Sequence, residues 1–207
     1  MDLRNAKNKM RKLWNLPRIA LKRVTNIAGM AFYSSQIDAV LAAYPKSGRT
    51  WFRFILSSYL ANVIGLKPPP DLHSMFTIIP NCDMDTERGL PALGFARHQT
   101  RLPLIPATHL TYSKIRFRSY PVIFMVRDPR DVMVSAYFHA TRQKRCFSGD
   151  IDGFLNDPKQ GITALTRYLN SWATGLQSRR HIVVSYEALS GDPHGQTAKA
   201  LAFLGNL

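Results

Sequence analysis

The fold is decided by the stretch Tyr44-Pro45-Lys46-Ser47-Gly48-Arg49-Thr50-Trp51. A short apolar run, residues 39–43, precedes it, and a run dense in aromatic and aliphatic residues, 52–60, follows it. That order predicts a strand, a tight turn and a helix that ends near residue 64. Because this helix is apolar around most of its circumference, we expect it to be buried. The first N–H groups of such a helix have no partner within it, and the helix dipole adds positive potential there. We therefore expect the turn to bind an anion, helped by the charge of Lys46 and the hydroxyls of Ser47 and Thr50.

The charge balance also points to an anionic ligand. The chain has 207 residues, enough for one domain with a substantial core. Its 28 Lys and Arg and 13 Asp and Glu give a formal net charge of +15. Such an excess suggests a polyanionic partner, an acidic membrane surface or a highly charged small ligand, and it can also serve solubility alone. The charge therefore narrows the class of partner without selecting one.

Cysteine usage and hydropathy suggest where the protein works. The two cysteines, Cys82 and Cys146, have no metal-ligand spacing. No apolar run is long enough for a membrane span, and no signal peptide with an apolar centre is found. We expect a reduced, cytoplasmic protein without a bound metal, although one disulfide stays open.

Residues 1–35 differ from the rest of the chain. Basic and apolar residues are interleaved there, and Asp2 is the only acid. Such a segment either lies peripherally on an anionic membrane or forms a solvated helix against its own domain, and we favour the second. We expect one domain over residues 36–207 and no nucleic-acid partner.

Further along the chain, strands alternate with helices. The β-branched run 122–126 and the apolar run 182–186 predict two more strands. Asp128 suits an N-cap and Pro129 a first helical position, which predicts a helix as far as about Arg142. We expect other helices around residues 165–176 and 196–204, a strand at 93–96, an irregular surface segment at 71–92 and a connector or short helix at 99–119. The alternation predicts an α/β domain with a largely parallel sheet, whose ligands bind beyond the carboxyl ends of the strands.

Three motifs, in this order, resemble those of the cytosolic-type sulfotransferases. The loop is not the usual nucleotide-triphosphatase pattern, because Lys46 precedes its only glycine. Pro-Lys-Ser-Gly-x-Thr-Trp resembles the 5′-phosphosulfate loop of that family, and the stretch 127–135 is similar to its 3′-phosphate motif. Residues 185–189 resemble its Tyr-Glu-Asp-Leu segment. The resemblance covers the chain from about residue 38 to its end. It implies a P-loop-like, three-layer fold and transfer of a sulfuryl group from 3′-phosphoadenosine 5′-phosphosulfate to a hydroxyl or an amine.

The resemblance implies a donor site in two halves. Lys46 and the loop N–H groups would hold the 5′ end, and Arg127 would hold the 3′-phosphate, since its planar fork suits phosphate oxygens. Ser135 follows Arg127 by about two helical turns and can face the same pocket. Trp51 and Tyr186 would border the adenine. The expected donor-binding residues are Lys46, Ser47, Gly48, Arg49, Thr50, Trp51, Arg127, Ser135 and Tyr186.

Sulfuryl transfer of this kind needs a group for the leaving oxygen and a base for the acceptor. By resemblance, Lys46 would stabilise the bridging oxygen as the bisphosphate leaves. A histidine past a strand between the two phosphate motifs would take the acceptor proton. His98 and His109 both fit, and we prefer His98 because Pro106 weakens a central strand before His109. We expect His139 to be structural and no metal to take part.

Some features of the chain depart from the family pattern. Arg49 stands where the family usually has a small residue, and it would either add charge to the 5′ site or face an anionic acceptor. The familiar enzymes continue into an Arg-Lys-Gly segment that we do not find before Leu207. This is expected to affect donor affinity, whether the chain is a fragment, a short branch or completed otherwise.

Two other functions stay open beside sulfuryl transfer. The protein could be a P-loop-like kinase or another nucleotide-binding protein, with Asp128 as a metal-binding carboxylate. It could also be an inactive binding module attached through residues 1–35. The acceptor class is equally open between small molecules, carbohydrates, lipids and protein hydroxyls.

Overall fold

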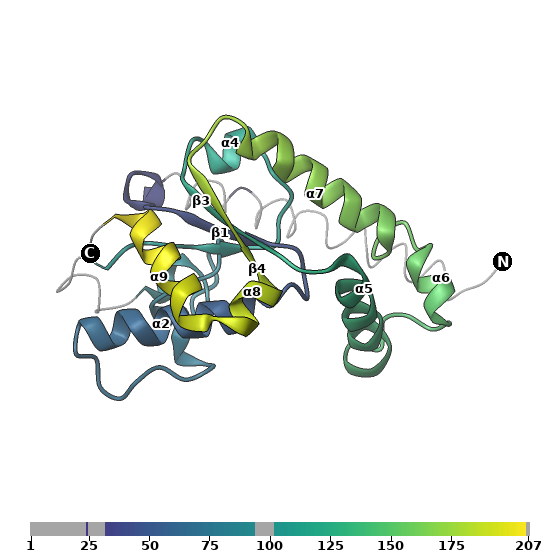
Figure 1. The fold of residues 1–207 in the computed structure, drawn as a ribbon, viewed down its shortest axis with the longest axis horizontal. Helices are drawn as coiled ribbons and strands as arrows, with labels where there is room; N and C mark the ends of the chain where they lie inside the picture. Colours follow the sequence, from purple (N-terminus) through teal and green to yellow (C-terminus); the bar gives the residue numbers. More distant parts are fainter. Residues whose placement is uncertain (1–23, 25–31, 94–101, 206–207) are drawn as a thin grey trace.

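A parallel sheet forms the centre of the molecule in this computed structural model, which describes residue 24 and residues 32–93 and 102–205. Four strands lie in the order β2-β1-β3-β4 (Figure 1). Their bounds are β1 Val40–Ala43, β2 Ala107–Thr108, β3 Val122–Val126 and β4 His181–Ser185. The predicted strands 39–43, 122–126 and 182–186 are confirmed to within a residue at each end. The predicted α/β class with a parallel sheet is confirmed as well.

The strand register brings three loops to one edge of the sheet. Ala42 of β1 pairs with Thr108 of β2 on one side and with Phe124 of β3 on the other. All four strands are parallel, so the loops after β1, β2 and β3 leave at the same edge. The chain runs from β1 to β2 on one side and then crosses to β3 on the other, which is a topological switch point.

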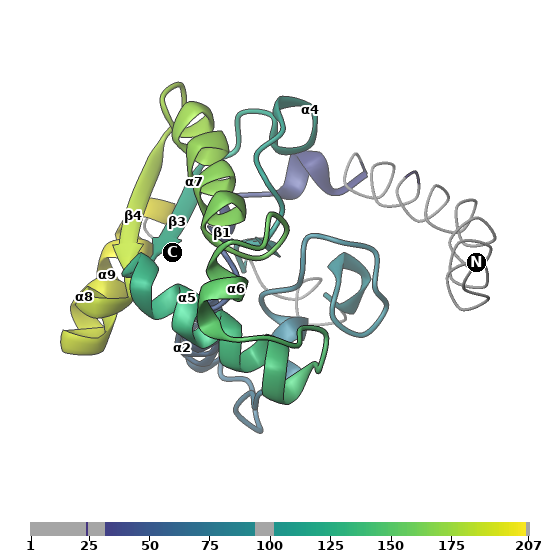
Figure 2. The same ribbon diagram turned by 90° about the vertical axis from the view of Figure 1, so that its right-hand side faces the viewer.

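Helices cover both faces of the sheet, as Figures 1 and 2 show. The helices α2, α8 and α9 pack on one face, and the long helix α7 packs on the other with α4 near its end. The helices α5 and α6 lie beyond the carboxyl end of β3, and a π-helical turn, η4, continues α5. Three short 3-10 helices, η1, η2 and η3, lie in connecting segments. The bounds are η1 Ser34–Gln36, α2 Arg49–Val63, η2 Ser74–Thr77, η3 Leu90–Ala92, α4 Lys114–Phe117, α5 Pro129–Phe138, η4 His139–Gln143, α6 Ile151–Leu155, α7 Ile162–Leu176, α8 Tyr186–Gly191 and α9 Pro193–Leu204.

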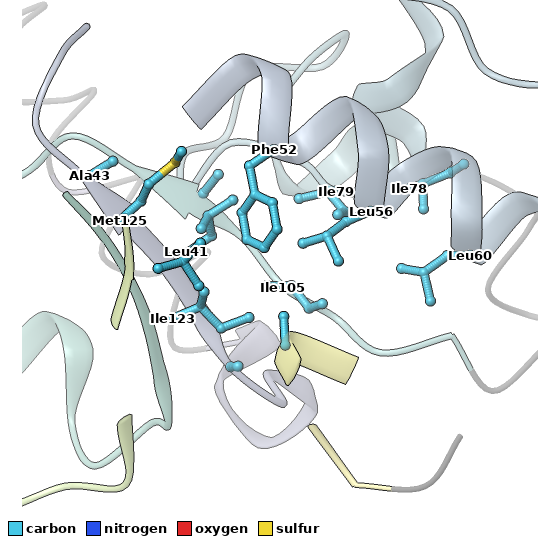
Figure 3. Packing of buried hydrophobic residues seen from close by; sticks show 14 of the residues in the cluster. Leu41, Ala43, Phe52, Leu56, Leu60, Ile78, Ile79, Ile105, Ile123 and Met125 are labelled. Atoms are coloured by element: carbon cyan, nitrogen blue, oxygen red, sulfur yellow. The ribbon is translucent and has the colours of Figure 1, made fainter. Parts of the chain in front are cut away.

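The core follows the alternation of side chains along each strand. Leu41 and Ala43 face α2, whereas Val40 and Ala42 face α7, and all four are fully buried. Figure 3 shows Phe52, Leu56 and Leu60 of α2 directed towards the sheet residues Leu41 and Ile123. Since both faces are covered, β1 is apolar at every position, as expected for a central parallel strand.

Two expectations about burial were wrong. Only one face of α2 is buried, because Tyr59 and Val63 on the opposite face are exposed. The segment 71–92 is irregular and partly exposed, as expected, but it is not confined to the surface. Met75, Ile78 and Leu90 are buried, and Ala107 N donates to Pro80 O while Cys82 N donates to Ala107 O. The segment therefore borders the sheet beyond β2, and its apolar residues lack a period because they lie in loops and very short 3-10 helices.

The connector 99–119 contains the edge strand β2 as well as the short helix α4. Pro106 directly precedes β2, and its carbonyl accepts a hydrogen bond from Leu41 N. A proline is tolerated there because β2 is a two-residue strand at the edge of the four-stranded sheet. The argument that Pro106 counts against a strand before His109 was therefore wrong.

Parts of two predictions lie outside the described residues. They are most of the segment 1–35 and residues 94–96 of the predicted strand 93–96. Among the helices that are described, none combines the length and the apolar character needed to cross a membrane.

Candidate active site

The predicted anion loop, residues 44–51, links β1 to α2. Two of its residues have a backbone conformation that most residue types adopt only at a cost in energy. Lys46 has a φ of 71° and Gly48 a φ of 88°, both in the left-handed region. Gly48 is the N-cap of α2 and offers no side-chain hydrogen bond to the helix start. A Cβ at Gly48 would overlap the ring of Tyr186, so this position also needs glycine for space. The start of α2 therefore has no side-chain cap, which is compatible with the predicted anion site.

On the β3 side of this loop, Arg127 is held by several contacts. Its Nη1 donates to the carbonyl oxygen of Lys46 at 3.3 Å, and its Nη2 lies 3.3 Å from Asp131 Oδ2. The guanidinium carbon lies 4.2 Å from the centre of the Tyr186 ring. Tyr186 in turn packs against Trp51, with ring centroids 5.6 Å apart. These contacts tie the second predicted motif to the first.

Asp128 and Glu187 fix the turn that carries Arg127. Asp128 Oδ1 accepts from Arg130 N at 2.9 Å and caps α5, as predicted. Hydrogen bonds from the side chain and backbone of Arg130 lower the pKa of Asp128 to about 2. The backbone N–H of Asp128 donates to Glu187 Oε1 at 2.9 Å. The third predicted motif, residues 185–189, therefore supports the second.

On the β2 side of the loop lies His109, directly after β2. Its Nδ1 is 2.7 Å from the carbonyl oxygen of Ala43. Because a carbonyl only accepts, Nδ1 carries a proton in this contact and Nε2 is left as an acceptor when the ring is neutral. Desolvation by the pocket walls, followed by the charge of Arg49, lowers the pKa of His109, although the residue as a whole is exposed. The ring is therefore neutral at neutral pH.

Arg49 and Arg53 place two cations on one face of α2. Arg53 is 2% exposed, donates to Asn81 Oδ1 at 2.8 Å and lies over the ring of Phe76. Arg49 has a buried Nε without a hydrogen-bond partner, and burial lowers its pKa to about 10. Burial, and next the charge of Arg49, lowers the pKa of Arg53 to about 9. Both guanidiniums are still charged at neutral pH.

These elements surround one pocket of about 710 Å³ at the carboxyl edge of the sheet. Among the described residues, no Asp or Glu lines it. Its lining includes five cationic side chains: Lys46, Arg49, Arg127, Lys144 and Lys159. A pocket of this composition favours a ligand with several negative charges.

Most of the predicted site residues meet in this pocket. Its lining includes Lys46, Gly48, Arg49, Thr50, Trp51, Arg127 and Ser135. Ser47 and Tyr186 lie behind this lining. Ser47 is 2% exposed and donates its backbone N–H to Tyr44 O, so that N–H is already used within the turn. His98, the preferred base, lies outside the described residues, whereas His109 lines the pocket.

Sequence reasoning missed several lining residues. Lys144 follows the π-helical turn η4, and Lys159 lies in the loop before α7. Neither belongs to a periodic pattern, and only the basic charge of these loops gave a signal. His139, expected to be structural, also lines the pocket, with its Nδ1 2.6 Å from Gln143 Oε1.

The described residues contain no group of three or more His, Cys, Asp or Glu placed to hold a metal ion. Asp128, the carboxylate considered for that role, is engaged with Arg130 through both of its oxygens.

The chain is similar in sequence and in structure to known sulfotransferases. Cytosolic sulfotransferase 10 of Arabidopsis thaliana is 24% identical over 202 residues, which cover 89% of this chain and 60% of that protein. Flavonol 3-sulfotransferase of Flaveria bidentis is 24% identical over 215 residues, covering 96% and 65%. A crystal structure of mouse sulfotransferase SULT7A1 complexed with PAP matches with a TM-score of 0.52 and 23% identity, over 82% of this chain and 59% of that one.

These matches cover most of this chain but a smaller share of each relative. The chain spans about three fifths of the length of these relatives. The likeness to the mouse structure supports the predicted P-loop-like, three-layer fold. A sequence model of the sulfotransferase domain matches residues 36–207, which is most of the chain. The resemblance of the three motifs is thereby confirmed, and this protein belongs to the sulfotransferase domain family.

Proposed function

We propose that the protein transfers the sulfuryl group of 3′-phosphoadenosine 5′-phosphosulfate to an acceptor hydroxyl or amine. The observation that carries the proposal is the two-ended cationic pocket. The loop with Lys46 and the open start of α2 form one end, and Arg127 with Ser135 forms the other. The donor has anionic groups at two ends of one nucleoside and so needs two separate anion sites. We also propose that the protein works in the cytoplasm, because one of its relatives is named a cytosolic sulfotransferase.

We assign the 5′-phosphosulfate end to Lys46 and the start of α2. The N–H groups of Arg49 and Thr50 at the start of α2 and the ammonium of Lys46 would bind its oxygens. Arg127 would bind the 3′-phosphate with its free Nε–H and one edge of the guanidinium, and the Ser135 hydroxyl would add a donor. Trp51, which lines the pocket, would lie against the adenine, and Tyr186 would hold Arg127 and Trp51 in place.

We assign the base to His109 among the described residues. It lies after β2, in the same pocket as Lys46, and its neutral ring has Nε2 available as an acceptor. The acceptor oxygen would attack sulfur while its proton passes to His109 Nε2. The bond from sulfur to the 5′-phosphate oxygen breaks, and the electron pair stays on the bisphosphate, where Lys46 stabilises it. No step in this transfer requires a metal ion or a covalent enzyme intermediate.

A thermal-shift titration tests the proposal. We expect 3′,5′-bisphosphoadenosine to raise the melting temperature more than ATP with Mg²⁺ does. At 100 times its Kd, the bisphosphate should stabilise the folded protein by about 2.7 kcal/mol. The variant Arg127→Ala should lose most of this shift, whereas Arg167→Ala, on the exposed surface of α7, should keep it. A larger shift with ATP and Mg²⁺ would favour the kinase alternative. No shift with either ligand would favour an inactive binding module.

Two variants distinguish the candidate bases. His109→Ala should abolish sulfuryl transfer and leave bisphosphate binding intact, because the base does not touch the donor phosphates. His98→Ala should retain turnover. The opposite pattern would return the assignment to His98.

A further inference from the structure

Arg49 carries a charge that no ion pair or hydrogen bond among the described residues compensates. It lines the pocket, its Nε is buried, and it forms no hydrogen bond with another described residue. The carboxylate with the strongest influence on it is Asp83, which accepts a hydrogen bond from Asp85 N and attracts Arg49 only at a distance. Burying an unpaired cation costs free energy unless a ligand provides the counter-charge. Arg49 is therefore placed as a cation that needs an anionic partner.

Tyr168 provides a second donor without an acceptor in the same region. The residue is 2% exposed, and its hydroxyl is buried without a hydrogen-bond partner. Trp172 lies beside it, but an indole N–H only donates, and this one is directed at Leu110 O at 3.0 Å. The hydroxyl proton of Tyr168 therefore has no acceptor among the residues that the structure describes. The charge of Arg49 acts on this hydroxyl and lowers its pKa against the larger effect of burial.

The position of Arg49 separates it from the donor's 3′ end. The titratable groups that act most strongly on Arg49 are Tyr168, Asp83 and Cys82, and Arg49 is in turn the strongest charge acting on His109. Cys82, Asp83 and His109 lie on the β2 side of the loop, since Cys82 N donates to Ala107 O and His109 follows β2. Tyr168 lies on α7, where its ring packs against Tyr44 and Phe124. Arg127 follows β3, on the opposite side of β1. If the nucleoside runs from Lys46 to Arg127, then Arg49 faces the space beside His109, where the acceptor must be.

We propose that the acceptor carries an oxyanion group, a carboxylate or a sulfate ester, in addition to the hydroxyl that is sulfated, and that Arg49 binds this group. The proposal rests on the proposed function, because it uses the acceptor side of that site. It names the substrate class: small hydroxy compounds with one negative charge. The guanidinium suits either oxyanion because both present two oxygens to its planar fork.

The test uses matched pairs of probes on the whole protein loaded with 3′,5′-bisphosphoadenosine. One pair is para-hydroxybenzoate and its methyl ester, and the other is hydroquinone monosulfate and hydroquinone. Binding is measured by calorimetry, and kcat/KM is measured with the sulfuryl donor. Wild-type protein should bind at least one anionic probe about 10-fold or more tightly than its neutral partner. The pair that shows the preference identifies the oxyanion.

Two variants carry the assignment to Arg49. Arg49→Gln removes the guanidinium but retains the backbone N–H assigned to the 5′ end of the donor. It should therefore lose the preference for the anionic probe and keep the affinity for 3′,5′-bisphosphoadenosine. Arg167→Gln removes the same charge from the exposed face of α7, next to Tyr168 in sequence, and should keep the preference. Tyr168→Phe should reduce the preference less than Arg49→Gln does.

Three results would overturn the inference. They are the absence of a preference in wild-type protein for either acid, a preference that survives in Arg49→Gln, and a loss of bisphosphate affinity in Arg49→Gln equal to its loss of acid affinity. The last result would assign Arg49 to the donor. Failure of the proposed function has a different signature, because 3′,5′-bisphosphoadenosine would then fail to stabilise even the wild-type protein.

Discussion

Arg127 and Arg49 line the same pocket from opposite sides of one loop, and they are held in different ways. On the β3 side, Arg127 bonds to Lys46 O and Asp131 and lies over the ring of Tyr186. On the β2 side, Arg49 forms no hydrogen bond with a described residue, and its charge is close enough to lower the pKa of a second cation, Arg53. One arginine is fixed before any ligand arrives, whereas the other lacks a counter-charge.

This difference between the two arginines indicates a different role for each side of the site. A cation already positioned by protein contacts loses little freedom on binding, so it suits a ligand that never changes, such as the donor. A cation without a partner gains most from a ligand that brings its own charge. We infer that the β3 side provides donor affinity and the β2 side provides selection among acceptors. Variants on each side of the loop test this contrast.

The largest effect is expected for Lys46→Ala, since Lys46 lies where the two sides meet. Its carbonyl holds Arg127, and its side chain lines the pocket. Loss of the ammonium should lower kcat by about 10²- to 10³-fold, because the leaving oxygen loses its charged donor. The carbonyl is retained, so the β3 side should stay in place. Single-turnover kinetics measure the effect, with the exposed Lys67→Ala as the control. Turnover at the wild-type rate would remove Lys46 from the chemistry.

The next effect tests the β3 side through two glycines with positive φ. Gly48 has a φ of 88° and packs against Tyr186, whereas Gly65 has a φ of 67° and nothing near its missing Cβ. Gly65→Ala should lower the free energy of unfolding by about 1 kcal/mol, the backbone cost alone. Gly48→Ala should cost about 2–4 kcal/mol, because the Tyr186 ring must also move. Urea unfolding measures both. Equal losses would mean that Tyr186 does not hold the loop.

A pair of matched variants compares the two arginines directly. Arg127→Gln should lower the free energy of unfolding of the ligand-free protein by about 1 kcal/mol, since it removes an ion pair and a cation–π contact. Arg49→Gln should raise it by about 1 kcal/mol, because it removes a buried charge without a partner. Thermal unfolding without ligand gives both values. If the two changes had the same sign, the contrast between the sides would be wrong.

The smallest effect concerns pH and the β2 side. The folded state holds the pKa of His109 below the ordinary value of 6.5, so the unfolded state binds a proton that the folded state refuses. Stability should therefore fall as pH drops below about 6.5 and should regain this contribution above it. His109→Gln should lose less stability than wild type between pH 7 and pH 5, as urea unfolding at the two pH values would show. An identical fall in both proteins would contradict the lowered pKa.

The sequence predicts the centre of the fold because its signals there are local. The β-branched run 122–126 and the cap formed by Asp128 and Pro129 are complete within a few residues, and both are confirmed. The edge strand β2 was missed because two residues carry no period and Pro106 argues against a strand. The burial of Met75, Ile78 and Leu90 in the segment 71–92 was also missed. These residues lie in loops and very short 3-10 helices, so they too carry no period.

The site shows the same division. Residues within the motifs, such as Lys46, Arg127 and Ser135, could be expected in one pocket because strand ends meet at one edge of a parallel sheet. Lys144 and Lys159 could not, since long connections between α5 and α7 bring them there. The partners of Arg127 and the isolation of Arg49 depend on side-chain packing, which no local pattern reports.

The contact of Tyr186 with Arg127 has a consequence for synthesis on the ribosome. The loop at residues 44–51 is translated early, whereas the ring that supports Arg127 and excludes a Cβ at Gly48 is translated near the end of the described chain. A nascent chain that has not yet exposed residue 186 has the loop sequence but lacks the ring that fixes Arg127 beside it. We therefore expect nascent chains to become competent for nucleotide binding late in translation, only after β4 and Tyr186 have emerged from the exit tunnel.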